Sequence, residues 1–538
     1  MVVLAVAAAV VLGLGLHEAW ADSPTFDEPV YVSAGLAAVL HHDLVYNEEH
    51  PVLAKVVAVL PVLFTHPELP ADGHWDRNDE RTYSARFVRA QLQAGTLRSV
   101  TMASRVIPLL EAIGLAFVLY ALGRDLFGRA AGALAGLLWL LAPFVLGLGH
   151  LDSMDVAFAL AVGAWSWSLL RWTRRPTPAR TAVVGVLSAV AVLTDVTGLI
   201  LAGIATLAVV AAGWRHSRRT ALIQGATVAG TVWVGVWVVY AALDPSVLLH
   251  PTVVLPLPYL EGMRYLFAND TIPGPGYLLG ASWTGGRWWY WPGSLLVKTV
   301  PTTLVVLVIG PWGLLAADRG TRRRAALVLG LPAAVLVVFT VGLPRDIGLR
   351  YLLPVVALWL VAASSVVPAV RRRRAGATAL VVAVVVAVGV AGVATAASAP
   401  DSLAWTTPPF TPAYAVVTNS DVDWGQTLYQ LQAWSRGKDP WVEYFGPRGL
   451  GVDAVPGARP LPPPAASRVT GWVAVSSTDL TSADRDRLSW LRAYCPVGVL
   501  GGTILVYRFR SPPESAAGPS RPVGPCPAGT GAFSVRTG

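Results

Sequence analysis

Charged residues are scarce in this chain of 538 residues, where they make up only 14% of the total. A soluble domain carries about a quarter of charged residues. Hydrophobic residues reach 54%, and the mean hydropathy is +0.55. The composition therefore excludes an ordinary soluble protein and predicts a polytopic membrane protein.

The net charge of +9 does not come from a basic face of the kind that binds nucleic acid. The arginines fall in short clusters between apolar runs, as they do in the cytoplasmic loops of membrane proteins. A Gly-rich phosphate-binding loop is also absent from the sequence. We therefore expect no nucleic-acid partner and no nucleotide cofactor.

Apolar runs recur up to residue 398, and most approach the roughly 20 residues that a helix needs to cross a bilayer. They predict about eleven transmembrane helices, of which the fifth and sixth are short enough to be tilted or broken. The runs lie near 2–16, 104–122, 130–148, 154–170, 181–193, 197–213, 221–243, 294–317, 325–343, 351–370 and 376–398.

Arginines cluster in alternate connections between these runs, which predicts the topology. The connections 149–153 and 194–196 contain no Lys or Arg, and the long loop 244–293 has only two. By the positive-inside rule the N-terminus is cytoplasmic, and 21–100, 244–293 and everything after 398 lie outside the plasma membrane. The clusters are Arg124 and Arg129; Arg171, Arg174, Arg175 and Arg180; Arg215, Arg218 and Arg219; Arg319 with Arg322 to Arg324; and Arg371 to Arg374.

The first apolar run has no basic residue before it, since Lys55 is the first Lys or Arg of the chain. Ala19-Trp20-Ala21 has the small-x-small form of a signal-peptide cleavage site. The missing basic flank instead favours an uncleaved first helix and a true start codon upstream of Met1.

Beyond the transmembrane domain 1–398, residues 399–510 are more polar and predict a small extracytoplasmic α/β domain. Residues 511–538, rich in Pro, Gly and Ser, predict a largely disordered tail. The strand-like runs are 441–445, 472–475 and 504–507, and the helical patterns are 424–435 and 480–493.

Cysteine is nearly absent from the chain, and the only two residues, Cys495 and Cys526, both fall in the part expected outside. An even pair in an oxidising compartment favours a disulfide. Two unpaired thiols are the alternative.

Acidic residues gather at the expected outer ends of helices, where the cost of a charge is lower than at the bilayer centre. Asp27 and Glu28 follow the first run, and Asp152 and Asp155 lie at another outer end. If the two loops converge, their carboxylates can deprotonate an acceptor hydroxyl or hold a divalent metal. The alternative is that they only end their helices at the interface.

Five stretches in order resemble the polyprenyl-phosphate-dependent glycosyltransferases of family thirty-nine, which have the GT-C fold and are relatives of protein O-mannosyltransferases and the lipid A aminoarabinose transferase. The resemblance covers about residues 24–435. It implies an enzyme that moves a hexose or pentose from a polyprenyl-phosphate donor in the membrane lipid to an extracytoplasmic acceptor, which is a protein, glycan or lipid. The stretches are DEPVY…NEEHPVLAK, ASRVIPLL…GHLDSMD, GYLLGASWTGGRWWYWPGSLLVKTVP, LRYLLPVV and NSDVDWGQTLYQLQAW.

In the outer loop 21–100, the resemblance assigns Asp27 as general base for the acceptor and Glu28 as its acidic partner or a metal ligand. His50 begins a motif that resembles HPPLAK, with Val52 in place of a second Pro, and is a second candidate metal ligand. Lys55 is a candidate for the donor phosphate, or it snorkels from an interfacial helix.

Asp152 or Asp155 matches the family's second acidic position, and both stay candidates because an offset of three residues puts them on one helical face. Lys298 and Arg350 are further candidates for the donor phosphate, with Arg350 in the family's RYLLP motif. A divalent metal ion is the one cofactor that these residues leave open.

Asp195 departs from the pattern, since many family members carry Lys there in a TKYTG motif. Glu111, an acid inside the second run, is a functional candidate with no assigned role. Two alternatives stay open: a catalytically silent GT-C scaffold, which Asp195 leaves alive, and a lipid or glycan transporter. Transporters usually place ionisable groups near the midplane, whereas here all but Glu111 cluster at helix ends.

Overall fold

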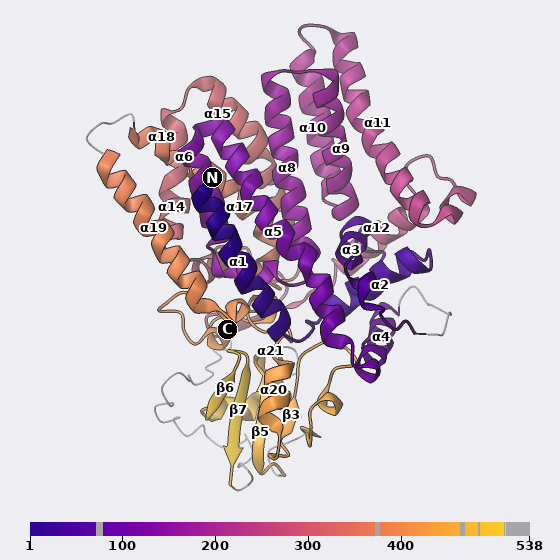
Figure 1. The fold of residues 1–538 in the computed structure, drawn as a ribbon, viewed down its shortest axis with the longest axis vertical. Coiled ribbons are helices and arrows are strands. Elements are labelled where there is room, and N and C mark those ends of the chain that lie inside the picture. The colour runs from indigo at the N-terminus through magenta and orange to yellow at the C-terminus, as the bar shows by residue number, and fades with distance from the viewer. Residues whose placement is uncertain (71–78, 372–376, 463–467, 482–484, 511, 513–538) are drawn as a thin grey trace.

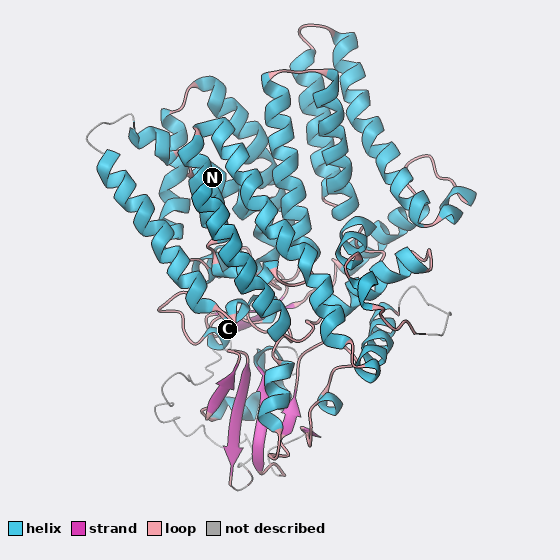
Figure 2. Cartoon of the chain, in the orientation of Figure 1, coloured by secondary structure: helices cyan, strands magenta, loops and turns pink. Residues whose placement is uncertain are grey.

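The computed structural model describes residues 1–70, 79–371, 377–462, 468–481, 485–510 and 512. Helices form most of the described chain, and a small β-sheet lies beyond one end of the helical part (Figure 2). Each of the eleven apolar runs contains helix, as expected for backbone that must satisfy its own hydrogen bonds in lipid.

Six helices in the described ranges are long and apolar enough to cross a membrane, and the pair α6–α7, bent by 62°, is a seventh candidate. The chain is therefore a multi-pass membrane protein, although fewer helices pass this test than the eleven expected. The helices of this part are α1 (Val2–Ala21), α5 (Leu97–Phe127), α6 (Arg129–Leu140), α7 (Pro143–Gly149), α8 (Met154–Arg174), α9 (Pro178–Thr194), α10 (Gly198–Gly213), α11 (Arg218–Leu243), α14 (Pro301–Ile309), η3 (Gly310–Ala316), α15 (Arg319–Ala325), η4 (Ala326–Gly330), α16 (Leu331–Val341), α17 (Leu353–Ala363), α18 (Val366–Arg371) and α19 (Ala377–Ser398).

The number of candidate spans is lower than expected partly because α9 and α10 are short. These helices have 17 and 16 residues, and the short break between them contains Asp195, which lies in a polar cavity described below. α14 likewise stops after nine residues and continues as the 3₁₀ turn η3. Such helices are shorter than the bilayer core requires of one continuous span.

Small residues let α5 and α6 pack closely, as is common between membrane helices. A Cβ atom at Gly132 would collide with the carbonyl oxygen of Tyr120. Two buried tryptophans link neighbouring helices: Trp139 of α6 donates to the Ala112 carbonyl of α5 at 2.8 Å, and Trp165 of α8 donates to Ser188 of α9 at 3.1 Å. These bonds satisfy the indole N–H groups, which burial would otherwise leave without a hydrogen-bond partner.

Short elements fill the region between the long helices and the sheet (Figure 1). They come from the two long loops expected outside and from the segment before α17. Their bounds are α2 (Glu28–Leu40), α3 (Val52–Val59), η1 (Val62–Thr65), α4 (Glu80–Ala94), η2 (Pro245–Leu249), α12 (Leu257–Asn269), β1 (Pro275–Leu278), β2 (Ala281–Thr284), α13 (Tyr290–Lys298) and η5 (Leu349–Leu352).

The C-terminal part contains a mixed five-stranded sheet in the order β4-β3-β5-β7-β6. β3 pairs in parallel with β4 and β5, whereas β7 is antiparallel to β5 and β6. The expected strands are present, the first one shorter than expected. Of the helix expected at 480–493, residues 482–484 lie outside the described residues, and 485–493 form the short helix α22 followed by the 3₁₀ turn η11. The bounds are α20 (Leu428–Ser435), β3 (Trp441–Glu443), β4 (Arg459–Pro460), β5 (Gly471–Ser476), α21 (Ser477–Thr481), α22 (Arg485–Leu488), η11 (Ser489–Ala493), β6 (Gly498–Leu500) and β7 (Ile504–Phe509).

Cys495 is disulfide-bonded, and no described cysteine is free. Its expected partner Cys526 lies outside the described residues, as does nearly all of the expected tail.

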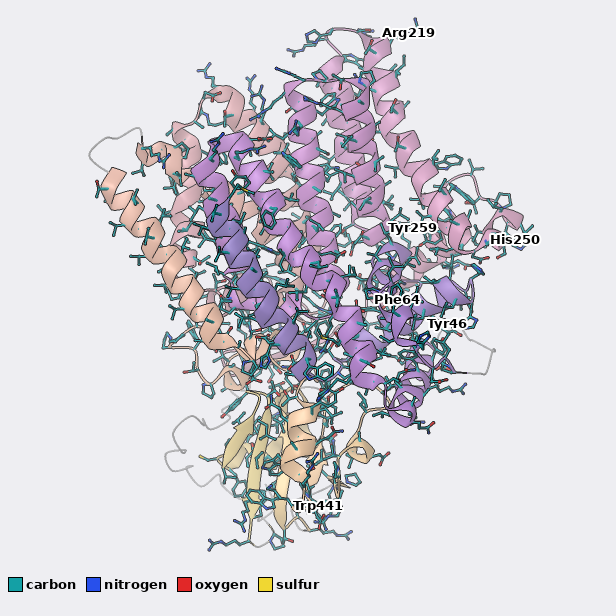
Figure 3. The ribbon with its side chains drawn as sticks, viewed as in Figure 1. Tyr46, Phe64, Arg219, His250, Tyr259 and Trp441 are labelled. Atoms are coloured by element: carbon teal, nitrogen blue, oxygen red, sulfur yellow. The ribbon has the colours of Figure 1, made fainter. Side chains whose placement is uncertain are left out.

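The arginine clusters lie at the end of the helices away from the sheet. Arg219 stands at that end, and Trp441 of the sheet stands at the opposite end of the molecule (Figure 3). α15 and α18, which carry later clusters, lie at the same end as Arg219 (Figure 1). The expectation of a shared side therefore holds for the clusters at Arg219, on α15 and on α18, while Arg372 to Arg374 lie outside the described residues.

Candidate functional site

A cavity of about 370 Å³ lies among the short elements between the long helices and the sheet, at the ends of α8, α9 and α16. Four of the predicted site residues line it, namely Asp27, His50, Asp155 and Arg350. The other four do not: Glu28, Lys55, Asp152 and Lys298. The structure thus divides the predicted residues into a group that faces the cavity and a group behind it.

Asp27 is placed by a contact between two distant parts of the chain. The Phe26 N–H donates to the Trp424 carbonyl at 2.8 Å, and the Ser23 N–H donates to the Gln426 carbonyl at 2.9 Å. The Phe26 ring also stacks on Phe445, with 5.0 Å between the centroids. These bonds hold the residues just before Asp27 against the start of the C-terminal part.

Two arginines hold the Asp27 carboxylate from opposite sides. Arg81 of α4 donates to Oδ1 at 2.8 Å, and Arg350 donates to Oδ2 at 3.3 Å. Burial by itself raises the pKa of this carboxyl, but Arg81 and then Arg350 outweigh burial and keep the pKa below its usual value. Asp27 is therefore an ionised carboxylate with both oxygens engaged.

Arg350 is buried but loosely held. Its Nη1 lies 3.3 Å from Asp27 and 3.7 Å from Asp155, and its Nε has no hydrogen-bond partner among the described residues. The guanidinium stands over the rings of Trp424 and Tyr351, at 4.4 and 5.0 Å. A buried guanidinium with an unused donor is suited to an anionic ligand.

The motif around Asp421 positions Arg350. The Asp421 carboxylate accepts from the Leu349 N–H at 2.7 Å, which fixes the residue before Arg350, and from Tyr290 and Ser294 of α13 at 2.9 and 2.7 Å. Lys298 at the end of α13 donates to the Asp421 carbonyl at 2.6 Å and to the carbonyls of Leu403 and Trp405 at 2.7 and 2.6 Å. Lys298 thus braces the wall of the cavity from behind.

Glu28 forms a closed buried network with Arg105 of α5. Arg105 Nε and Nη2 donate to its two oxygens at 2.8 and 2.7 Å, and the N–H groups of Thr25 and Asp152 also bind it. Nη1 also donates to the carbonyls of Ala19 and Asp22, and Nη2 donates to the carbonyl of Ser23, at 2.8 Å each. Glu28 therefore has no free oxygen facing the cavity in which His50 lies.

Asp152 and Asp155 do not share a helical face, because α8 begins only at Met154. Asp155 lies in the first turn of α8 and lines the cavity near Arg350. Asp152 lies beside Glu28, and burial together with that neighbouring carboxylate raises its pKa well above the usual value. The sequence left both Asp152 and Asp155 as candidates, and of the two only Asp155 lines the cavity.

Lys55 is turned away from the cavity. Its Nζ donates to the carbonyls of Asn47 and His50 at 2.6 and 2.8 Å, and burial lowers its pKa to about 8. It thereby fixes the loop that presents His50, whose Nε2 lies 3.6 Å from Glu49. Among the residues described, no group of three or more His, Cys, Asp or Glu side chains is arranged to hold a metal ion.

An apolar groove of about 600 Å³ adjoins the cavity between α12 and α16. The groove and the cavity share Asp270, Phe339 and Leu343 as lining residues. The rest of the groove is lined mainly by Val335, Val338 and other aliphatic or small residues of α16 and the turn after it, with Phe267 opposite. A charged cavity therefore continues into a hydrophobic channel.

Sequence reasoning missed several residues of this site. Arg81, Glu49, Asp270 and Arg345 line the cavity, and Asp195, noted only as a departure, lines it too. Arg81 gave no signal in the sequence because it lies 54 positions from its partner Asp27. Trp424 lies in NSDVDWGQTLYQLQAW, one of the stretches that carry the family resemblance. That resemblance could therefore have indicated Trp424 as a residue of the site.

The chain matches no known protein-family model, and no curated protein matches it in sequence. Solved structures of similar overall fold include ArnT from Cupriavidus metallidurans bound to undecaprenyl phosphate, at 20% identity and a TM-score of 0.41, with 72% of this chain and 63% of that one covered. The apo form of the same protein gives 15% identity and a TM-score of 0.43, with coverage of 93% and 97%.

The oligosaccharyltransferase of Archaeoglobus fulgidus, in complex with zinc and sulfate, is similar at 15% identity and a TM-score of 0.40. The alignment covers 77% of this chain and only 54% of the oligosaccharyltransferase. These are low-level similarities of fold, and the resemblance to family thirty-nine stays a prediction. The chemistry of the site is argued below from its own residues.

Proposed function

We propose that the protein is a membrane glycosyltransferase of the GT-C type that uses a sugar linked to polyprenyl phosphate as donor. One observation carries the proposal: a cavity with an ionised aspartate and a loosely held buried arginine opens into an apolar groove. A lipid-linked sugar phosphate has the matching parts, namely a hydrocarbon chain, an anionic phosphate and a polar sugar.

In this proposal the hydrocarbon chain lies in the groove between α12 and α16, and Arg350 binds the phosphate. A guanidinium can hold phosphate oxygens with two parallel hydrogen bonds, which an ammonium cannot do. Asp27 accepts the proton of the acceptor hydroxyl as general base. His50 and Asp155 face the same space and contact the sugar or the acceptor.

A metal ion has no obvious place in this arrangement. Glu28 is occupied by Arg105, and of the two proposed metal ligands only His50 faces the cavity. If an ion takes part, the cavity offers ligand atoms on His50, Glu49, Asp155, Asp195 and Asp270. Removing divalent cations with a chelator during the transfer assay tests this point directly.

We also propose that all eleven apolar runs cross the membrane, with the N-terminus in the cytoplasm. The shorter helices α9 and α10 run alongside the long helices α8 and α11 (Figure 1). With the arginine clusters inside, the cavity and the C-terminal sheet lie outside the membrane. A reporter fused after Gly538 should be active only outside, and activity only in the cytoplasm would contradict this orientation.

The test of the function is a transfer assay in membranes that contain the protein. Radiolabelled polyprenyl-phosphate mannose, glucose and arabinose are supplied in parallel, and label is followed into protein, glycan and lipid fractions. We expect label transfer from one of the three donors, and its loss with Asp27→Asn. Tight binding of the donors without transfer would favour the catalytically silent scaffold.

A further inference from the structure

We propose that Arg81 positions Asp27 so that the donor phosphate can take Arg350 away from it, and that donor binding thereby releases the base. This inference rests on the proposed function and adds an order of events to it. Arg81 acts through Asp27 and not on the substrate.

The first argument is the asymmetry of the two contacts on Asp27. The Arg81 contact is short, at 2.8 Å, and the Arg350 contact is longer, at 3.3 Å, on the other oxygen. Arg81 is itself anchored, since its Nη1 donates to the Phe26 carbonyl at 2.9 Å and its guanidinium lies 4.3 Å from the Phe26 ring centroid. Asp27 can therefore lose Arg350 and keep its place.

The second argument is that Arg350 is not committed to Asp27. It divides its charge between Asp27 and Asp155, and its buried Nε donates to no described residue. A phosphate with several charged oxygens offers stronger charge-assisted hydrogen bonds than these two long contacts. Binding of the phosphate should therefore draw Arg350 off Oδ2 of Asp27.

The consequence concerns basicity. With both arginines in place the Asp27 carboxylate is a weak base, because opposite charges nearby favour its ionised form. Loss of one of them frees Oδ2 and makes it more basic. Among the described residues, the other charged or titratable groups that face Asp27 are His50, Tyr31 of α2, Asp155 of α8 and Tyr351.

The transfer step then balances as follows. The acceptor oxygen bonds to the anomeric carbon of the sugar while its proton passes to Oδ2 of Asp27. The bond between the anomeric carbon and the phosphate oxygen breaks, and its electron pair stays on that oxygen. The polyprenyl phosphate that leaves is the anion to which Arg350 is bound.

The test is the affinity of undecaprenyl phosphate for the full chain in nanodiscs, measured by ligand-dependent thermal stability. Asp27→Asn removes the competitor for Arg350 and should tighten binding at least about fivefold, the low end of typical coupling between sites. Arg81→Ala leaves Asp27 dependent on Arg350 and should weaken binding by a similar factor. Arg81→Lys, which keeps the charge, should restore part of the affinity.

The double variant Arg81→Ala/Asp27→Asn separates positioning from direct contact. If Arg81 acts only through Asp27, its removal should change nothing once Asp27 is neutral. Arg89→Ala, an exposed arginine on the same helix, is the matched control and should bind as the wild type does.

An equal loss from Arg81→Ala in both backgrounds would make Arg81 a phosphate ligand and overturn the inference. Unchanged or weaker binding by Asp27→Asn, or no effect of Arg81→Ala in either background, would also overturn it while leaving the donor class intact. If the wild type and all variants fail to bind undecaprenyl phosphate, the proposed donor and the inference fall together.

Discussion

Asp27 and Glu28 are neighbours in the chain, yet their arginine partners Arg350 and Arg105 are held by very different numbers of hydrogen bonds. Arg105 has five hydrogen bonds of 2.7–2.8 Å, two of them to Glu28, and its side chain has no exposed surface. Arg350 reaches Asp27 only at 3.3 Å and has a free Nε facing no described partner. We call the Glu28–Arg105 pair closed, because its hydrogen bonds are all made within the protein. We call the Asp27–Arg350 pair open, because Arg350 Nε has no described partner.

The difference separates structure from function at adjacent positions. A buried ion pair is tolerable only when further hydrogen bonds satisfy the remaining donors and acceptors. The Glu28 pair meets that condition by itself and ties α5 to the start of α2 and to the loop before α8. The Asp27 pair does not meet it, which leaves a place for a ligand.

The largest expected effect is on catalysis at the open pair. Asp27→Asn keeps nearly the same shape and removes the base, so the transfer rate should fall by about 10²–10⁴-fold. Thermal stability and membrane insertion should change little. Turnover close to that of the wild type, measured with radiolabelled donor, would remove Asp27 from the mechanism.

The closed pair should instead show its effect on stability. Glu28→Gln leaves Arg105 buried without its counter-charge, and breaking such a pair costs about 3–5 kcal/mol. We expect a clear fall in the temperature of unfolding in detergent, compared with the exposed control Asp453→Asn. A Glu28→Gln protein that is stable but inactive would move Glu28 into the reaction.

A smaller effect is expected for the donor contact. Arg350→Ala should lower the transfer efficiency about 10- to 100-fold, since hydrogen bonds to charged groups are worth about 1.5–3 kcal/mol. Arg350→Lys should keep part of the activity at a higher donor KM. Arg264→Ala, on the exposed side of α12, serves as the control. An unchanged donor KM in Arg350→Ala would place the phosphate elsewhere.

The smallest effects on donor binding are expected from the two buried lysines. Lys55 and Lys298 each donate to backbone carbonyls behind the cavity wall. Their change to Met should reduce stability but raise the donor KM by less than about threefold, which is below 1 kcal/mol. A rise of about tenfold for either variant would restore that lysine to the phosphate site.

Much of the fold follows from local pattern. The apolar runs, the arginine clusters at one end and the strands near 472–475 and 504–507 depend on residues close together in the sequence, and the structure has them. The short α9 and α10 match the short fifth and sixth runs. The early end of α14, which continues as the 3₁₀ turn η3, has no signal in the apolar pattern.

The site was predictable only where the resemblance named a residue. Arg105 had no partner within reach along its own helix, because its partner Glu28 lies 77 positions away. The roles of Lys55 and Lys298 depend on carbonyl groups whose positions no side-chain pattern reveals. Neighbouring residues with the same charge, such as Asp27 and Glu28, differ only in what the fold brings to them.

The backbone bonds from Ser23 and Phe26 to Gln426 and Trp424 also have a consequence for biosynthesis. The loop that carries Asp27 is made early, but the segment that pins it leaves the ribosome some four hundred residues later. A chain that stops after its last membrane helix would contain Asp27 but lack the segment whose backbone bonds hold the residues just before it. Copies that end before Trp424 should therefore be inert, so that activity itself reports that synthesis has passed this segment.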